Sequence, residues 1–241
     1  MSKLLIIGDP KGTHSMSALR KYAAEDIWVW ENDSRHIYTI NQICDRINVT
    51  TDLQELVDKG MKFTVVIGNP PYGNAGKLAV RFLNKSMELS DDVRMVLPRS
   101  IRKPSALNRI NLDFHCVNDV DVDDSAFAAT IDAVVQNWEK KPYKREKIEV
   151  FSKHEDFEFV TPEAADCMIG RVGNGPTGRV KTEDFMGYKR DHYYLKVKSE
   201  TVLNNLISIQ DELRLIASQS NGMMSLSKHE LILTYSNHFG Q

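Results

Sequence analysis

A run of β-branched residues that ends at two adjacent prolines constrains the fold of this chain more than any other stretch. The run from Phe63 to Ile67 has the composition of a strand that is buried on both faces, as in a parallel sheet. Pro70 and Pro71 lack the backbone N–H that a central strand donates, so the strand has to end before them. In open α/β sheets, ligands bind at the carboxyl ends of the strands, so Asn69 and Tyr72 are predicted to lie at a binding site.

The polar loop after this strand suits the recognition of an amino group. The Asn69 side-chain oxygen and the carbonyls of Pro70 and Pro71 are acceptors that together can receive both hydrogens of an NH2 group. The ring of Tyr72 offers a flat face on which a planar base or amide could stack. A proline-stiffened turn with no binding role is the structural alternative.

Short apolar runs alternate with amphipathic segments in the first part of the chain. Seven of these runs are predicted to be strands: 3–8, 27–31, 47–51, 63–67, 92–97, 112–117 and 130–138. An acidic loop at 119–124 is expected to join the last two. Strands that alternate with helices predict an α/β fold, with a sheet of about seven mostly parallel strands and helices on both faces.

The composition is that of an ordinary globular protein, and its 241 residues suit one medium domain with a small appendage. The chain has no apolar run of about 18 residues, so no membrane partner is expected. Cys44, Cys116 and Cys167 are widely spaced, which favours reduced thiols in a cytoplasm over disulfides or a zinc site. Because the net charge is −2, contact with nucleic acid would require a local basic patch.

The sequence is less periodic after the basic stretch from Lys140 to Arg145 than before it, and we place a domain boundary at this stretch. Residues 168–198 hold seven Lys or Arg against three acidic residues, and 168–179 is predicted to be a glycine-rich, basic loop. Helical periodicity returns at 201–217. We predict nucleic-acid binding by four basic residues of this region: Arg171, Arg179, Lys181 and Lys228. A solvated basic face is the alternative.

The stretch from Asn69 to Tyr72 matches the Asn-Pro-Pro-Tyr signature of S-adenosylmethionine-dependent amino methyltransferases. The chain resembles the members of that group that act on N6 of adenine in DNA, and the likeness covers residues 3–140. The family opens with a strand and an (Asp/Glu)-Pro-x-x-Gly-x-Gly loop that approaches the methionine part of the cofactor. Asp9, Gly12 and Thr13 match this loop, although it is one residue short and His14 stands where a second glycine is usual.

Two carboxylates match further cofactor-binding positions of the family. The family has Val-x-Glu-x-Asp at the end of its second strand, which gives Glu31 the role of binding both ribose hydroxyls. Asp52 matches the aspartate that accepts from the adenine amino group of the cofactor. Either carboxylate could instead cap a helix. Phe127 lies in a later stretch that is similar to the family, where its ring would pack against a flipped base or in the core.

The resemblance implies a Rossmann-like methyltransferase domain at 1–140 and a DNA-recognition region at 141–241. The implied activity is methyl transfer from S-adenosylmethionine to an adenine flipped out of double-stranded DNA, with Asn69 and the Pro70 carbonyl holding the amino group. The compact layout is similar to phage-encoded members, and closure over the cofactor by a second subunit of a homodimer is an option. The alternatives are an RNA adenine or a protein glutamine as substrate, or a non-catalytic DNA-binding or interaction protein.

Overall fold

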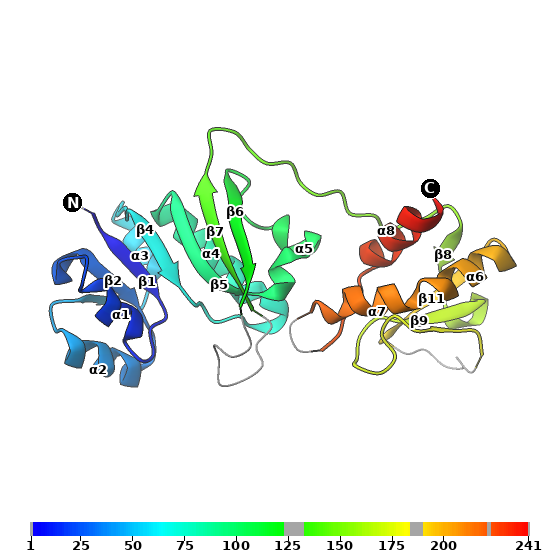
Figure 1. Cartoon of the computed structure of the whole chain (residues 1–241), viewed down its shortest axis with the longest axis horizontal. Coiled ribbons are helices and arrows are strands. Elements are labelled where there is room, and N and C mark those ends of the chain that lie inside the picture. The colour runs from blue at the N-terminus through cyan, green and yellow to red at the C-terminus, as the bar shows by residue number, and fades with distance from the viewer. Residues whose placement is uncertain (1, 123–132, 184–189, 221–222, 241) are drawn as a thin grey trace. The chain divides into compact units, whose positions relative to one another are not determined.

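The computed structural model describes residues 2–122, 133–183, 190–220 and 223–240 (Figure 1). Contacts within the chain divide it into two units, Met1–Ile148 and Glu149–Gln241. The division falls after residue 148 instead of 140 because the intervening segment binds back to the first unit. The Arg145 guanidinium donates to three backbone carbonyls of that unit, and the N–H of Ile148 donates to the Asn108 side chain at 2.8 Å.

The first unit is built on a sheet of seven strands: β1 (Leu4–Ile7), β2 (Ile27–Trp30), β3 (Asn48–Thr50), β4 (Val65–Gly68), β5 (Asp92–Pro98), β6 (Phe114–Asp121) and β7 (Ala133–Lys140). The strand order is β3-β2-β1-β4-β5-β7-β6, and within this sheet β7 is the strand that runs in the direction opposite to the other six. The predicted fold class is therefore confirmed. Phe127 and the start of the last predicted strand lie outside the described residues.

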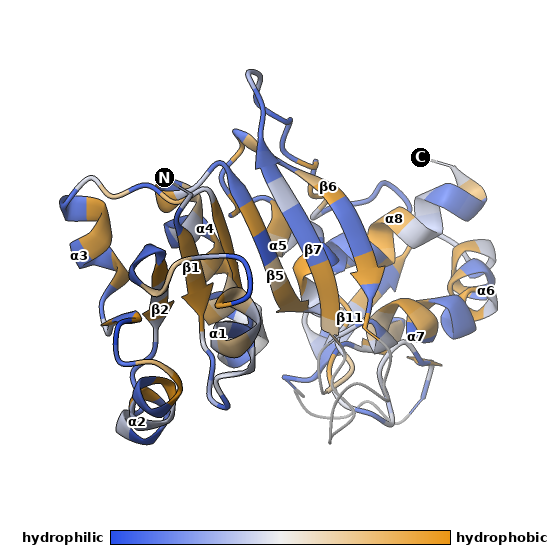
Figure 2. Ribbon diagram, turned by 60° about the vertical axis from the view of Figure 1, so that its left-hand side comes forward, coloured by the Kyte–Doolittle hydropathy of each residue, from blue (hydrophilic) through white to orange (hydrophobic). Residues whose placement is uncertain are grey.

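Helices cover the sheet from both sides. The longer helices of this unit are α1 (Thr13–Ala18), α2 (Ser34–Ile43), α3 (Leu53–Asp58), α4 (Lys77–Leu89) and α5 (Pro104–Leu107). Side chains of β1 alternate between the two layers, since Ile6 packs in one apolar cluster with Ile40 of α2 and Ile7 packs in another with Leu83 of α4. β1 is apolar along its whole length, as a strand between two helical layers must be (Figure 2).

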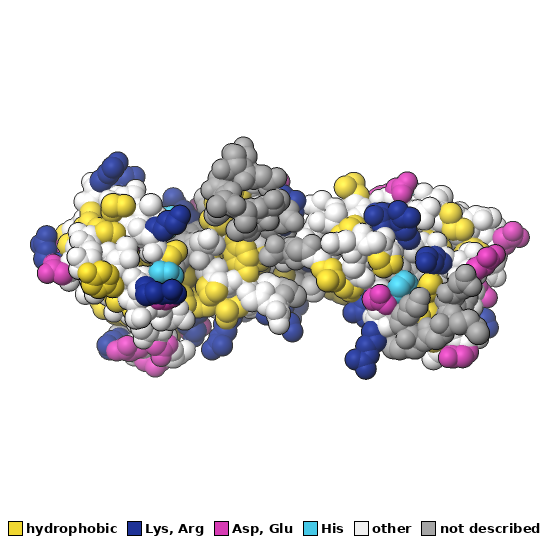
Figure 3. Space-filling view, turned by 90° about the horizontal axis from the view of Figure 1, so that it is seen from below, with side chains coloured by type: hydrophobic (Ala, Val, Ile, Leu, Met, Phe, Trp, Pro, Cys, Tyr) yellow, Lys and Arg dark blue, Asp and Glu magenta, His cyan; other side chains and the backbone are white. Residues whose placement is uncertain are grey.

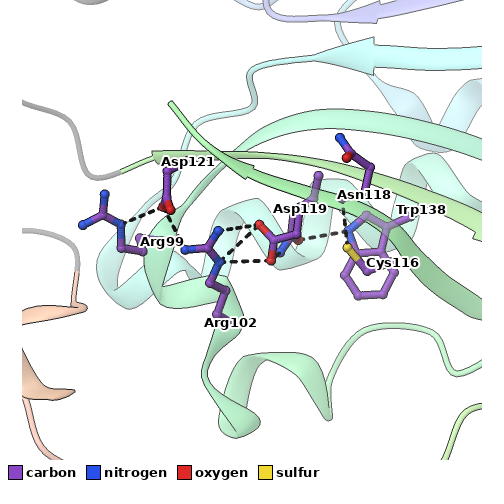
Figure 4. A network of polar contacts seen from close by, with 8 residues as sticks. Arg99, Arg102, Cys116, Asn118, Asp119, Asp121 and Trp138 are labelled. Atoms are coloured by element: carbon purple, nitrogen blue, oxygen red, sulfur yellow. Dashed lines mark hydrogen bonds and ion pairs between the residues drawn. The ribbon is translucent and has the colours of Figure 1, made fainter. Parts of the chain in front are cut away.

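The predicted acidic loop at 119–124 is wrong in part, because β6 continues to Asp121. Its carboxylates are neutralised by the short 3-10 helix η3 (Arg99–Arg102), as Figure 4 shows. Arg102 donates to both oxygens of Asp119, at 2.7 and 3.0 Å, and to Asp121 at 2.8 Å. Gln136 of β7 also donates to Asp119, at 3.0 Å. Paired in this way, the carboxylates can continue a strand ladder.

The second unit contains a sheet that the sequence analysis did not predict. Its strands are all antiparallel, in the order β10-β9-β11-β8: β8 (Phe157–Phe159), β9 (Cys167–Gly170), β10 (Val180–Lys181) and β11 (His192–Val197). The expected loop at 168–179 therefore begins only at Arg171. One face of this sheet packs against three helices: α6 (Glu200–Ser208), α7 (Gln210–Ser218) and α8 (Lys228–Phe239). The predicted helix at 201–217 is divided at Ile209.

Candidate functional site

Backbone hydrogen bonds hold four loops side by side at the carboxyl edge of the first sheet. Three N–H groups just beyond the strand ends continue the ladder, Gly8 to the Trp30 carbonyl at 3.0 Å, Asn69 to Ile7 at 2.9 Å and Glu31 to Thr50 at 3.1 Å. The loops after β1 and β4 also touch, because a Cβ at Gly8 would lie 2.9 Å from the Asn69 carbonyl oxygen. The structure thus brings the loop from Asn69 to Tyr72, which is predicted to hold the target amino group and is called the target loop below, beside the predicted cofactor-binding residues.

The loop after β4 presents Asn69 to solvent. The Asn69 side chain is exposed and makes no hydrogen bond to another described residue, so its amide oxygen is available as an acceptor. Pro70 is buried and Pro71 is exposed. Gly68 allows this approach, since a Cβ there would collide with the backbone of Ile7. Close packing of β4 on β1 therefore places the loop.

The ring of Tyr72 is held in place by contacts with the protein core. Its ring is half-buried and packs against the larger apolar cluster of the unit. Burial raises the pKa of its hydroxyl to about 12, so the phenol stays protonated at neutral pH. Its carbonyl accepts from the N–H groups of Leu78 and Ala79, at 3.1 and 3.3 Å, at the start of α4. The part of the ring that remains exposed has a fixed orientation.

The loop after β1 is shaped by Asp9. This carboxylate is fully buried and accepts from the N–H and hydroxyl of Ser15, both at 2.7 Å, and from the N–H of His14 at 3.1 Å. Asp9 therefore holds the loop's own backbone. His14 and the exposed Thr13 lie in the first turn of α1, so position 14 has helical backbone and does not require glycine. A Cβ at Gly12 would collide with the side chain of Ile43.

Glu31 is a buried carboxylate whose orientation is fixed by its own loop. Its Oε1 accepts from the N–H groups of Asn32 and Asp33, at 2.9 and 3.1 Å. Its Oε2 lies 3.3 Å from Nδ1 of His36. A carboxylate offers about four lone-pair positions, so these contacts leave capacity for a hydroxyl of a ligand.

Asp52 lies at the rim of a cavity of about 260 Å³. The cavity is lined by residues from the end of β2, the β3–α3 loop, the start of α3 and α4: Trp30, Thr51, Asp52, Leu53, Gln54, Leu78, Arg81, Phe82 and Lys85. Asp52 also caps α3, since its side chain accepts from the N–H of Gln54 at 2.8 Å, which confirms the capping alternative without excluding a ligand. The rings of Trp30 and Phe82 meet edge to face, with centroids 4.5 Å apart.

The aromatic walls of this cavity were not predicted as site residues. Trp30 precedes Glu31 in the sequence, but its contact with Phe82 joins β2 to α4 and follows from the packing of the fold. The volume is close to the lower limit of about 300 Å³ for ligand pockets. A cavity lined by two aromatic rings and a carboxylate suits a planar ring that bears an amino group.

The four basic residues predicted to bind nucleic acid divide between the two edges of the second sheet. Arg171, Arg179 and Lys181 are exposed around the β9–β10 connection, and the Arg171 guanidinium lies 5.4 Å from the ring centroid of Tyr193. Lys228 lies beside β8, at the other edge. On the face seen in Figure 3, basic and acidic side chains are interspersed over each unit. This is the mixed surface that a net charge of −2 suggests.

Neither a metal site nor a membrane-spanning helix is found in the described ranges 2–122, 133–183, 190–220 and 223–240. No group of His, Cys, Asp and Glu side chains there could hold a metal ion. No helix there has the length and apolar character needed to cross a membrane.

No family model and no curated protein match the sequence. Several solved structures are similar to the chain over somewhat more than half of its length. TrmN from Thermus thermophilus shares 15% identity over 58% of this chain and 44% of that chain, with a TM-score of 0.48. A dimethyladenosine transferase from Plasmodium falciparum shares 18% identity over 58% and 56%, with a TM-score of 0.42. The 23S rRNA methyltransferase ErmE shares 16% identity over 59% and 63%, with a TM-score of 0.44.

The chain spans less than two thirds of each of these three structures. Its fold is established by the order and directions of its own strands. The first unit is Rossmann-like.

Proposed function

We propose that the chain is an S-adenosylmethionine-dependent methyltransferase that acts on the N6 amino group of adenine in DNA. The observation that carries the proposal is the juxtaposition at one sheet edge of an amino-accepting loop and two carboxylates. Asn69 follows β4 and Glu31 follows β2, and the end of β1 lies between them: the Gly8 N–H donates to the Trp30 carbonyl of β2, and the Ile7 carbonyl of β1 accepts from the Asn69 N–H. Ligands of open α/β sheets bind at this edge.

The residues fit S-adenosylmethionine in two respects. Glu31 is oriented by its backbone contacts and keeps lone pairs for a ribose hydroxyl. The cavity beside Asp52 has aromatic walls and a carboxylate at its rim, which suits the adenine ring and its amino group. When bound, the cofactor supplies a methyl group on a sulfonium, which is already activated for transfer.

The target loop would then hold and orient the acceptor nitrogen. The Asn69 amide oxygen and the Pro70 carbonyl would accept the two hydrogens of the amino group and draw it toward tetrahedral geometry, which exposes the lone pair. The exposed part of the Tyr72 ring would stack on the base. As the nitrogen lone pair forms its bond to the methyl carbon, the carbon–sulfur bond would break, and the methylated amino group would release one proton to solvent. The protein would contribute mainly by aligning the two reactants, which lowers the barrier.

Double-stranded DNA is the substrate that we propose, and the second unit is its recognition region. Adenine N6 is enclosed in the duplex, so the nucleotide has to be flipped out and the flanking phosphates held. Exposed Arg171, Arg179 and Lys181 on the β9–β10 edge supply charges for this contact. The same acceptor loop would serve an RNA adenine, so the substrate has to be decided by experiment.

The test compares Asn69→Ala with Asn74→Ala, which removes an exposed asparagine from the following 3-10 helix η2 (Asn74–Gly76). Transfer of tritiated methyl from S-adenosylmethionine to unmodified DNA and to RNA is measured, together with cofactor binding by calorimetry. We expect all three proteins to bind the cofactor, and only Asn69→Ala to lose transfer to DNA. Equal turnover by Asn69→Ala and wild type would refute the assigned role. Transfer to RNA but not to DNA would contradict the proposed DNA substrate and identify RNA as the substrate.

A further inference from the structure

The second unit has a cavity of about 450 Å³ at the β8 edge of its sheet. It is lined by aromatic and charged side chains from the segment before β8, from β8 and from the start of α8: Ser152, Lys153, His154, Phe157, Glu158, Phe159 and Lys228. The Lys228 ammonium lies 4.0 Å from the ring centroid of Phe159. Lys228, one of the four basic residues predicted to bind nucleic acid, thus lines a concave site.

The aromatic wall of this cavity is held rigidly. The ring of Phe159 meets the rings of Phe157 and Tyr193 edge to face, with centroids 6.0 and 5.3 Å apart. The imidazole of His154 stacks on Phe157 at 4.9 Å, and its Nδ1 accepts from the N–H of Asp156. A wall with fixed rings loses little side-chain freedom when a flat ligand stacks on it.

The start of α8 is fixed as well. The Ser227 side chain accepts from the N–H of Glu230, and the Glu230 carboxylate accepts from the N–H of Ser227, which forms a capping box. Lys228 is the first residue of the helix, so its backbone position is determined while its long side chain can still reach a ligand. Lys153, on the opposite segment of the wall, is exposed and supplies a second positive charge.

We propose that this cavity binds an unpaired nucleotide of the target nucleic acid: the Lys228 ammonium leaves the face of the Phe159 ring to bind the phosphate together with Lys153, and the base takes its place on the ring. A purely apolar ligand would leave both ammonium groups without a role, and a simple anion would leave the aromatic wall without one. A nucleotide has a flat ring and a negative charge, which is the combination that single-strand binding sites recognise. The proposal rests on the proposed function, because extrusion of the target adenine leaves its partner base unpaired.

The test measures how tightly the full-length protein binds two fluorescein-labelled DNA duplexes: one with a single unpaired thymine, the partner base of adenine, and the same duplex fully paired. Phe159→Leu removes the ring and keeps apolar volume, and we expect it to weaken binding of the bulged duplex about tenfold. Phe159→Tyr keeps the ring and should bind as wild type does. Lys228→Gln should lower the slope of log affinity against log salt by about one.

Matched controls remove the same groups outside the cavity. Phe239→Leu takes away an exposed ring of α8, and Lys147→Gln takes away an exposed ammonium of the first unit, so neither should change binding of the bulged duplex. The proposal is overturned if Phe159→Leu binds the bulged duplex as tightly as wild type, or if Phe239→Leu weakens it equally. Thermal unfolding of each variant verifies that the second unit is folded.

The binding experiment contains no cofactor and no methyl transfer, so its result is independent of catalysis. If the wild type fails to transfer methyl groups but the Phe159 effect is present, the nucleotide site stands and the enzymatic proposal fails. If methyl transfer occurs and Phe159→Leu does not weaken binding, the enzymatic proposal stands and the nucleotide site fails.

Discussion

Replacement of Gly8 by alanine measures how closely the loops after β1 and β4 have to approach each other. Gly8 has φ +70° and Gly60 has φ +64°, so alanine at either position adopts left-handed backbone at a cost of about 1–2 kcal/mol. A Cβ at Gly60 meets nothing within 4 Å, whereas one at Gly8 lies 2.9 Å from the Asn69 carbonyl oxygen. Gly60→Ala therefore isolates the backbone cost, and Gly8→Ala adds the contact.

Ordinary contact begins at 3.4 Å, so Gly8→Ala forces the Asn69 carbonyl to retreat by roughly half an ångström. Because a misplacement of about 1 Å can cost about a hundredfold in rate, we expect methyl transfer to fall about tenfold in Gly8→Ala and to stay unchanged in Gly60→Ala. The assay is transfer of tritiated methyl under conditions in which urea denaturation shows both variants to be folded. Equal activity of the two variants would refute the claim that this contact sets the position of the target loop.

Three further predictions concern the supporting structure. Burial acts to raise the pKa of Asp119, but its hydrogen bonds, chiefly from Arg102, outweigh that effect and hold the pKa below its ordinary value. The stabilisation lost in Asp119→Asn should therefore be complete at pH 7 and decrease progressively as the pH falls below about 4, and urea curves that stay equally far apart at pH 3 would contradict this. Arg145→Ala leaves three carbonyls without their donor and should lower the free energy of unfolding by about 2 kcal/mol. A fragment of residues 1–148 should likewise unfold at a higher temperature than one of residues 1–140, and equal midpoints would place the boundary at 140.

The first sheet could be predicted because its strands are defined by local composition. Each of β1, β2 and β4 is a short apolar run that is buried by helices on both sides, and that burial leaves a continuous signal in the sequence. The sheet of the second unit left a weaker signal. β10 has only two residues, whereas the alternation of Tyr193, Leu195 and Val197 in β11 is the signal from which that strand could be predicted.

The sequence predicts which residue types follow the strand ends of the candidate site. It does not predict the hydrogen bonds that those residues make. The positions of Asn69 and Glu31 just after strand ends could be predicted from the apolar runs that precede them, and their roles in binding stay predictions. The use of both Asp9 oxygens by Ser15 and His14 could not be predicted, since it depends on how the loop turns into α1. The helical backbone of His14 likewise explains why a second glycine is dispensable at that position.

The ladder that continues past the strand ends has a consequence for motion. The N–H groups of Gly8, Glu31 and Asn69 are each bonded to the neighbouring strand, so the first residues of the loops after β1, β2 and β4 are fixed to the sheet. Changing the spacing between these loops would require breaking backbone hydrogen bonds. The distance between groups bound to different loops is thus set during folding, and alignment of two reactants there does not depend on a closing movement of these loops.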